Sequence, residues 1–485
     1  MLDFVHLHVH SQYSILDGQA SIPRLVDKAM RDGQPGIAIT DHGNMFAIKE
    51  FYNYVSKQNG KKHDKIKGLK KLKEKLERLL NEEPEIGAYI ARLEAELEPL
   101  KPKIEKDEAL PEEAEHYNRT KALLDDVLAM QKDFDFSVEK AAAKIEELES
   151  VPDFKPIIGC EVYVARRRLH LKEKSEGDLG GYHLILLAKN QTGYHNLIKI
   201  VSKAWTEGFY GNPRTDRVEL EKYHEGLICC SACLGGEIPK CITNDRLEAA
   251  EEAIQWYKNL FGEDYFLELQ LHKATVERAN HEAYELQLKV NEKLIEYSEK
   301  FGVKLVCTND VHFVDEDNAE AHDRLICLST GKDLDDPDRM LYSKQEWMKT
   351  RAEMEAIFGD RPDAMLNTVE ICNRVEHYSI DHSPIMPNFE IPEDFGTEEG
   401  YRRQFSEQDL FDEFTRDENG KVVMEESAAR KKIEKLGGYD KLYRIKLEAD
   451  YLKKLTYEGA HKRYGERLTE EQEERLNFEL HIMKT

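Results

Sequence analysis

Histidines alternate with apolar residues at the start of the chain, in the run Phe4-Val5-His6-Leu7-His8-Val9-His10. Because successive side chains of a β-strand point to opposite faces, a strand here would present these imidazoles on one face. Short apolar runs follow, and segments whose apolar residues recur at helical spacing separate several of them. The pattern predicts an α/β protein.

Several elements have predictable bounds. A helix is predicted over 22–31, because Ser21 is a typical cap and Pro23 suits a first turn. An apolar strand over 36–40 then ends in Asp41-His42-Gly43. Further strands are predicted over 157–164, 183–188, 227–231, 265–269 and 303–308, and further helices over 247–261 and 276–301. This alternation is typical of a barrel or an open doubly wound sheet.

Between Lys57 and Phe154 the composition changes to Lys, Glu and Leu. Apolar residues recur there at helical spacing, as in Ile90, Leu93 and Leu97. The pattern is interrupted by Pro84, Pro99, Pro102 and Pro111, which predicts several helices and not one rod. We expect a coiled-coil-like helical insert over 58–153, which is either a solvated spacer or an arm that binds a partner or clamps DNA.

The C-terminal part has a different pattern. A proline-spaced stretch from Ser383 to Pro392 predicts an extended linker. Charged amphipathic helices follow, one over 442–458 and one from Thr469 to the end, which opens with a Thr-x-x-Gln capping signal. The predicted organisation is a barrel from 1–57 and 154–378, the insert over 58–153, and a linker with helices over 379–485.

Composition limits the function classes. A chain of 485 residues with 40% hydrophobic side chains can form two or three domains. Its net charge of −25 argues against nucleic-acid binding over the whole surface, so such contact must be local or carried by cations. The eight cysteines lack a regular framework, and no apolar targeting or membrane-spanning run occurs. We expect a cytoplasmic protein without a membrane partner.

Side chains that can bind metal ions recur at or just past the ends of predicted strands, where barrel enzymes place their chemistry. These residues are His8, His10, Asp17, Asp41, His42, Glu161, His183, Cys233, Asp310 and His312. Imidazoles, carboxylates and a thiolate together suit Zn²⁺, Mn²⁺ or Fe²⁺ better than Mg²⁺. Two such ions about 3.5–4 Å apart can activate water and stabilise phosphoryl oxygens, so no protein nucleophile is required.

Some of these residues have a second interpretation. Cys233 and His183 lie in apolar segments and could serve only for packing. Asp41 could orient His42 from behind and not bind metal itself. His6 could be a ligand, but a buried supporting role is the preferred prediction.

Other residues are outside this pattern. Arg166 and Arg167 could clamp a phosphate beside Glu161 or could belong to a solvated loop. Several histidines lack a partner at ligand spacing and are expected on the surface: His170, His195, His224 and His272.

The order of these motifs resembles that of the polymerase and histidinol phosphatase (PHP) family. Segments such as His8-Val9-His10-Ser11-Gln12-Tyr13-Ser14 and Thr308-Asn309-Asp310-Val311-His312-Phe313 are similar to the N-terminal part of bacterial DNA polymerase III alpha subunits. The resemblance implies a distorted TIM-like (β/α)7 barrel. It also implies two to three divalent ions, zinc or manganese with iron as an alternative, bound by His8, His10, Asp17, His42, Glu161, His183, Cys233, Asp310 and His312.

The resemblance also implies a role in DNA replication. A full ligand set is similar to that of family members credited with 3′–5′ proofreading exonuclease activity on the primer end. One alternative is a metal-stabilised scaffold that docks a separate proofreading exonuclease or a sliding clamp; another is a small-molecule phosphatase or amidohydrolase. The chain is expected to stop before the palm that carries the aspartates of the DNA-directed DNA polymerase, a nucleotidyltransferase.

Overall fold

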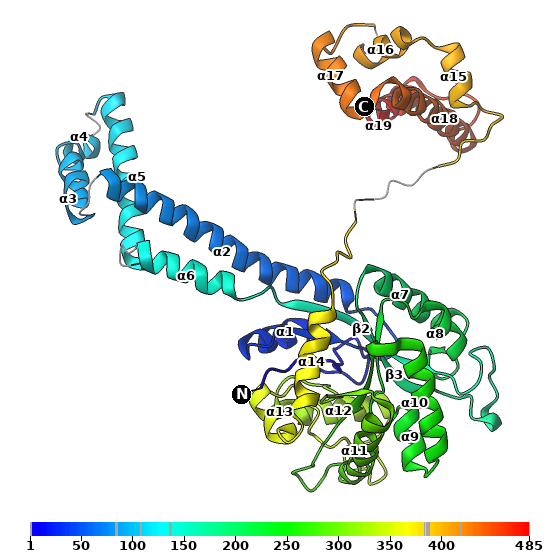
Figure 1. Cartoon of the computed structure of the whole chain (residues 1–485). Helices are drawn as coiled ribbons and strands as arrows, with labels where there is room; N and C mark the ends of the chain where they lie inside the picture. The colour runs from blue at the N-terminus through cyan, green and yellow to red at the C-terminus, as the bar shows by residue number, and fades with distance from the viewer. Residues whose placement is uncertain are drawn as a thin grey trace. The chain divides into compact units, whose positions relative to one another are not determined.

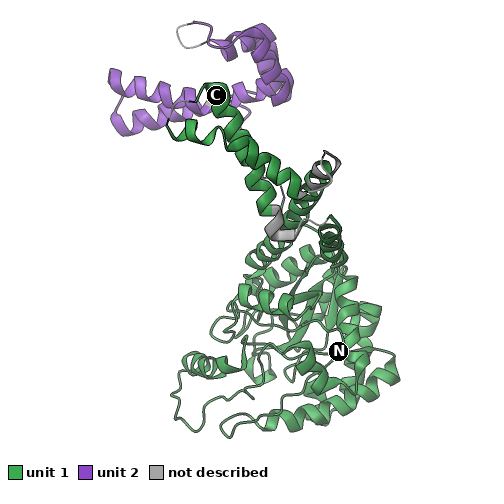
Figure 2. Cartoon of the chain, turned by 90° about the vertical axis from the view of Figure 1, so that its left-hand side faces the viewer, with its two compact units in different colours: residues 1–381 green, residues 382–485 purple. Residues whose placement is uncertain are grey.

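The computed structural model describes residues 2–82, 86–106, 109–134, 138–382, 384, 389–416 and 420–484. It divides the chain into two compact units, Met1–Asp381 and His382–Thr485, which Figure 2 colours separately. Pro84 and half of the proline-spaced stretch, residues 383 and 385–388, lie outside the described residues.

A curled, mixed sheet forms the centre of the first unit. In spatial order its strands are β1 (Gly36–Ile39), β2 (Lys155–Val164), β3 (Tyr182–Ala188), β5 (Leu227–Cys230), β6 (Tyr265–Leu269) and β7 (Lys304–Cys307), and β4 (Arg214–Thr215) pairs with β2. β3 is antiparallel to both of its neighbours, and the other pairs are parallel. This arrangement confirms the predicted distorted barrel.

Strand alternation creates two cores. Ile157, Ile185, Ile228, Phe266 and Val306, one from each of five strands, are buried together inside the curled sheet. Residues at the alternate positions pack in a separate core with the surrounding helices. The same alternation places Glu161, His183 and Glu268 on the inner face of their strands, beyond this apolar layer.

The prediction that residues 4–10 form a strand is wrong in part. Residues 4–10 are extended, but their only ladder contact in the described structure is a bridge between Val9 and Val311. Hydroxyl groups replace part of the ladder, since the Val9 N–H donates to Thr40 Oγ1 at 2.8 Å and the Val5 N–H to Thr368 Oγ1 at 2.9 Å. The segment still joins β1 to the residues after β7, because it also bonds to the backbone of Ala38 and Val311.

Helices surround the sheet (Figure 1). They are α1 (Ile22–Arg31), α7 (Gln191–Thr206), α8 (Arg217–Tyr223), α9 (Glu237–Thr243), α10 (Leu247–Phe261), α11 (Glu282–Phe301), α12 (Ala319–Thr330), α13 (Arg351–Phe358) and α14 (Pro362–Arg374). The predicted bounds of α1 and α10 are confirmed, although the Ser21 side chain makes no capping hydrogen bond. α11 begins six residues later than predicted, because the Asn280 side chain accepts the Ala283 N–H while the Asn280 N–H donates to Tyr342.

The segment between β1 and β2 is helical. Its helices are α2 (Ile48–Glu82), α3 (Ile86–Leu97), α4 (Lys101–Glu105), α5 (Pro111–Phe134) and α6 (Val138–Ser150). α2 begins among barrel residues, where Phe51 and Val55 are buried, and continues without a break past position 57. α2 lies beside α6, and α3 lies beside α5 with Tyr89, Leu93 and Val127 buried between them (Figure 1).

The second unit is helical. It contains α15 (Glu398–Gln404), α16 (Glu407–Thr415), α17 (Glu426–Leu436), α18 (Gly438–Tyr464) and α19 (Glu470–Lys484), with a core that includes Tyr401, Leu410 and Ile433. The Thr-x-x-Gln cap is confirmed, because the Gln472 N–H donates to Thr469 Oγ1 at 3.3 Å and the Thr469 N–H to Gln472 Oε1 at 3.0 Å. In the described residues of the chain, every helix is too short or too polar to cross a membrane.

Candidate metal centre

Four side chains meet above the apolar interior of the barrel. His8 Nε2 lies 3.1 Å from His10 Nε2 and 3.1 Å from Asp310 Oδ1, and His10 Nε2 lies 3.2 Å from the same carboxylate oxygen. Glu161 Oε1 is 3.4 Å from His8 Nε2. Ligands about 2.0–2.1 Å from a tetrahedral ion lie about 3.3 Å from one another. The spacing of these four groups therefore fits one metal ion.

Glu161 connects this group to a second one. Its Oε1 atom lies 2.7 Å from His183 Nδ1, and Cys233 Sγ lies 3.5 Å from the same ring nitrogen. Glu161, His183 and Cys233 therefore form a site with carboxylate, imidazole and thiol donors. Gly235 keeps the turn close, since a Cβ there would lie 2.8 Å from the His183 ring.

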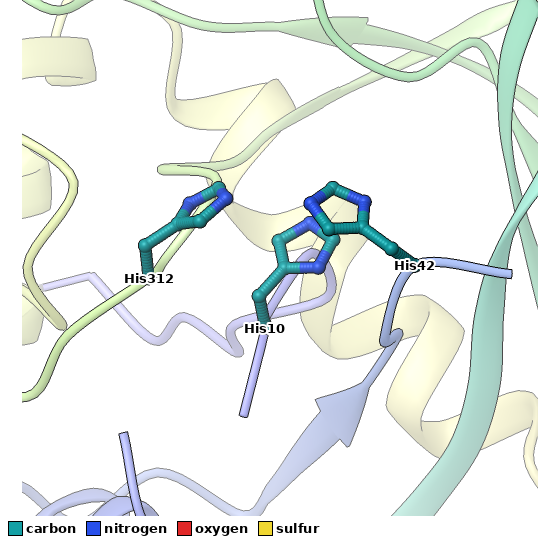
Figure 3. Close-up of side chains that lie close together, drawn as sticks. All are labelled: His10, His42 and His312. Carbon is teal, nitrogen blue, oxygen red and sulfur yellow. The ribbon is translucent and has the colours of Figure 1, made fainter. Parts of the chain in front are cut away.

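A third group contains His10, His42 and His312, whose rings approach one another from three separate segments (Figure 3). The rings of His10 and His42 stack with centroids 3.9 Å apart. Asp17 completes the group, because its Oδ2 atom lies 2.9 Å from His42 Nε2 and 3.7 Å from His312 Nε2. The structure thus brings all nine predicted ligands into three adjoining groups.

Three imidazoles are anchored through Nδ1. His8 Nδ1 lies 2.6 Å from Glu268 Oε1, His10 Nδ1 lies 3.0 Å from Ser14 Oγ, and His312 Nδ1 lies 2.8 Å from the Asp310 carbonyl oxygen. These partners favour the tautomer with the proton on Nδ1, which leaves the Nε2 lone pair free to bind a metal ion.

Buried polar atoms that lack hydrogen-bond partners also support a metal site. Asp310 Oδ1 and His312 Nε2 are buried and make no hydrogen bond within the described residues. A buried polar atom without a partner costs about 1–3 kcal/mol. A bound cation would satisfy both atoms, so the donor set fits a divalent transition metal ion.

The clustered charges shift the pKa values of the imidazoles. Burial alone would lower the pKa of His42, but the carboxylates of Glu161 and Asp17 raise it to about 10. The pKa of His312 rises to about 9 against the effect of burial, chiefly because of Asp17. Burial and the neighbouring His42 and His312 lower the pKa of His10 to about 3. Protons on His42 and His312 therefore balance the carboxylates in the metal-free protein.

The carboxylates show the opposite shifts. Burial would raise the pKa of Asp310, but His8 and His10 lower it well below its usual value. His183 and His42 lower the pKa of Glu161 in the same way. Both groups are therefore ionised, as metal ligands must be.

Glu268 is a supporting residue that the sequence prediction missed. It is buried, and its Oε1 atom also accepts hydrogen bonds from Thr308 Oγ1 at 2.5 Å and Gln270 Nε2 at 2.9 Å. This carboxylate fixes the orientation of His8. The available signal was one acidic residue in the otherwise apolar strand Tyr265–Leu269.

Asp41 supports His10. Its carboxylate accepts hydrogen bonds from the Ser11 N–H and from the Ser14 hydroxyl, both at 2.7 Å, and Ser14 in turn contacts the His10 ring. The predicted role behind His42 is supported only indirectly, through the His42 N–H that donates to Ser14 Oγ.

Left-handed backbone conformations occur beside the ligands. Asp310 itself has φ +46°, Ala232 before Cys233 has φ +63°, and Leu16 before Asp17 has φ +64°. Such conformations are uncommon for residues other than glycine, and they cluster at functional sites. Here they turn three ligands towards the same point.

The prediction that His272 lies on the surface is wrong. His272 is buried, its Nε2 lies 3.1 Å from the Asn309 carbonyl oxygen, and its backbone N–H donates to Gln287 Oε1. The ring lines a cavity of about 210 Å³ that opens beside His42 and Glu161. The spacing of histidines in the sequence could not reveal this position, because the conformation of the loop after β6 determines where the His272 ring lies.

Two aromatic-ring residues around Asp17 were also missed. The Tyr342 hydroxyl donates to Asp17 at 2.9 Å, and His322 Nε2 lies 3.8 Å from the same carboxylate. His322 is buried on α12. Both residues follow the last predicted ligand, so no ligand-type spacing pointed to them.

The remaining predicted residues have other partners. His6 Nε2 lies 2.7 Å from the Lys349 carbonyl oxygen, and burial lowers the pKa of His6 to about 4. Arg167 binds Asp178 through two guanidinium nitrogens, and Arg166 lies over the Tyr182 ring. His6 therefore has a structural contact, whereas a role of the arginines towards phosphate stays a prediction.

Comparisons with known proteins agree with this geometry. Residues 6–80 and 107–272 match the PHP domain family. DNA polymerase III subunit alpha of Borreliella burgdorferi is 33% identical over 396 residues, covering 81% of this chain and 26% of that protein. The subunit of Treponema pallidum is 32% identical over 88% of this chain and 27% of its own length, and that of Thermus aquaticus is 32% identical over 84% and 25%.

This chain therefore spans about a quarter of the length of these relatives. Seven of the nine predicted ligands lie within the matched residues 6–80 and 107–272, and Asp310 and His312 lie after them. The chain carries a PHP domain, within a sequence that is homologous to part of bacterial DNA polymerase III alpha subunits.

Proposed function

We propose that the chain is part of a replicative DNA polymerase III alpha subunit and that its metal centre hydrolyses phosphodiester bonds at the 3′ end of DNA. The observation that carries this proposal is the convergence of the nine predicted ligands in three adjoining groups. Six of them line one open cavity: His42, Glu161, His183, Cys233, Asp310 and His312. In the longer protein, a proofreading exonuclease and a sliding clamp would be its partners.

The donor set would hold two or three divalent ions. When bound, such ions supply Lewis acidity and an activated water for attack on phosphorus. Glu161 contacts histidines of all three ligand groups, so it would help to hold more than one ion. Asp17, held by Tyr342, would support the ion at His42 and His312.

The cavity has room for a phosphodiester group. Its volume of about 210 Å³ corresponds to about seven waters at about 30 Å³ each. Besides the ligands, its wall carries hydrogen-bonding side chains that could contact sugar or phosphate oxygens: Gln270, His272, Asn280, Gln287 and Ser343.

An exposed aromatic pair supports a nucleic-acid substrate. The rings of Trp205 and Phe209 stack with centroids 5.5 Å apart, and each side chain is more than two-fifths exposed. Trp205 Nε1–H donates to the carbonyl oxygen of Gly43, the residue after the ligand His42. A nucleobase could stack on such a pair, whereas a small phosphomonoester would gain nothing from it.

The test is a nuclease assay with protein loaded with Zn²⁺ or Mn²⁺. We expect release of nucleotides from a 3′-labelled single strand and from a mispaired primer end. His8→Ala and Asp310→Ala should abolish the release and the metal content, whereas His195→Ala, a change to an exposed histidine, should preserve both. Metal-loaded protein that releases no nucleotide would contradict the proposal.

Burial of the ligands favours a scaffold as a second candidate. His8, His10 and Glu161 are completely buried, so a bound ion would also contribute to folding free energy. If chelation lowers the melting temperature while no phosphoester is cleaved, the scaffold function is preferred. Faster turnover of a small phosphomonoester than of DNA would instead favour a phosphatase.

A further inference from the structure

One stretch of α2 has the opposite charge to its surroundings. From Lys57 to Arg78 the sequence contains ten Lys and Arg against three Asp and Glu. Over residues 79–150 the ratio reverses to nine against twenty, and the whole chain carries −25. Positive charge is therefore concentrated on this stretch alone within the insert.

Four lysines lie on one side of α2 and make no ion pair within the described residues. Leu69 is buried on the opposite side, which packs along α6. Lys62 and Lys70 are engaged by Asp153 and Glu149 near the end of α6. The four exposed lysines that make no such ion pair share about a third of the helix circumference: Lys57, Lys61, Lys67 and Lys71. Lys65 is also exposed but lies outside this arc. We call these four residues the lysine face.

Two glycines interrupt this face. A Cβ added at Gly60 or at Gly68 would have no heavy atom within 4 Å, so neither glycine is needed for packing within the chain. Each costs a helix about 1 kcal/mol relative to alanine. Both leave the α2 backbone open to close approach by a partner.

A cleft borders the lysine face. It has a volume of about 760 Å³ and lies between α2 and the segment Leu148–Asp153. Its wall carries four lysines and one histidine against three carboxylates, and two of these carboxylates bind Lys62 and Lys70. Lys67 and Lys71, which belong both to the cleft and to the lysine face, therefore keep their charge available.

We propose that the lysine face binds the sugar-phosphate backbone of double-stranded DNA without reading its sequence. The lysine face runs from residue 57 to residue 71 and spans about 21 Å of straight helix, which is somewhat less than two thirds of a duplex turn of about 34 Å. The face contains no aromatic side chain on which unpaired bases could stack, so a duplex fits better than a single strand. The proposal is independent of hydrolysis at the metal centre.

Fluorescence anisotropy of the full chain with a labelled 30-base-pair duplex tests this inference. Phosphorothioate linkages at the 3′ ends keep hydrolysis from affecting the readout. The variant K57Q/K61Q/K67Q/K71Q removes the lysine face, and K431Q/K435Q/K441Q/K453Q removes the same charge from exposed lysines of the second unit. Circular dichroism melting checks that both variants fold.

We expect the first variant to bind at least tenfold more weakly at 50 mM KCl, and the matched control to bind like the unmodified chain. Each lost phosphate contact should reduce the slope of log affinity against log salt by about 0.9, so the slope should fall by about three to four. Equal affinities of the two variants would overturn the proposal. So would a salt-sensitive dimer of the unmodified chain that the first variant loses without a change in DNA affinity.

Discussion

The candidate metal centre and the lysine face hold their charges in opposite environments. At this centre, imidazoles and carboxylates are buried or half-buried, several imidazoles are anchored through Nδ1, and the groups are close enough to share ions. On α2, lysines stand in solvent, and those of the lysine face make no ion pair in the described structure. Buried charge depends on its immediate neighbours, whereas exposed charge acts at long range and is screened by salt. Metal removal should therefore disturb the metal centre, whereas added salt should act on the lysine face.

The two regions are joined where the insert leaves the barrel. The Asn59 side chain bonds to both the N–H and the carbonyl oxygen of Phe154, and Lys62 Nζ donates to the Val151 carbonyl oxygen at 2.9 Å. The outgoing and returning segments are therefore neighbours. The helical insert over 58–153, which we call the arm, can therefore be removed without opening a gap in the chain. Its removal makes it possible to test whether the two regions act separately.

The largest change is expected from Glu268→Gln. The amide would weaken the orientation of His8 Nε2, and loss of such a partner typically costs 10–100-fold in metal affinity. Competition against a zinc-binding dye measures this loss. Glu263→Gln, at an exposed glutamate just before the same strand, is the control and should leave affinity unchanged. Equal affinity in both variants would show that Glu268 does not support the site.

Lys349→Met probes a buried charge outside the ligand groups. Burial lowers the pKa of Lys349 to about 7, with partial compensation by Glu346 and Glu353. The unfolded chain, with a pKa of about 10.4, binds more protons between these values, so the stability of the unmodified protein rises from pH 7 to pH 10.

The variant lacks this dependence. Its stability relative to the unmodified protein should therefore be higher at pH 7 than at pH 9, by on the order of 2 kcal/mol. Urea unfolding at both pH values measures the difference. A difference that is the same at both pH values would mean that Lys349 keeps an ordinary pKa.

Trp205→Ala tests the aromatic pair beside the metal centre. If a terminal base stacks there, single-stranded DNA should bind about fivefold more weakly, which corresponds to about 1 kcal/mol. Trp205→Phe should retain most of the affinity, and Trp256→Phe is the control at a partly buried tryptophan. When DNA binds to metal-free protein, quenching of Trp205 fluorescence reports stacking without hydrolysis. Unchanged emission would exclude stacking.

The smallest effect is expected from removal of the arm. Residues 63–150 can be replaced by a short Gly-Ser linker, since Lys62 and Val151 are in contact. The metal content and the denaturant midpoint of the barrel should change little, because neither a predicted ligand nor a residue of the barrel cores lies within 63–150. Elemental analysis and urea unfolding provide the measurements. Loss of metal on deletion would show that the two regions are coupled.

Local sequence predicted much of the architecture. The bounds of α1 and α10 follow from their apolar periodicity and flanking residues, and apolar runs identified every strand of the described sheet except the two-residue β4. The first strand and the start of α11 differed for one reason. Side chains of Thr40, Thr368 and Asn280 take backbone hydrogen bonds there, and these partners are not visible in a local pattern.

The sequence likewise predicted some residues of the candidate site and missed others. The nine ligand-type residues were identified from their chemistry, their position at strand ends and the family resemblance. Glu268, His272, His322 and Tyr342 were not, because each acts through a partner that is distant in sequence. Asp41 was expected behind His42, and only the fold connects its carboxylate to His10 through Ser14.

The sequence by itself determined the α/β alternation, the types of metal donor and the concentration of lysine on one helix. These properties depend on residue identity and on spacings of two to four positions. The tertiary structure alone decided which nitrogen of each histidine faces the centre, which polar atoms are left without partners, and which lysines stay free. Those properties depend on distances between segments up to three hundred residues apart, such as His8 and Asp310, which the barrel brings to 3.1 Å.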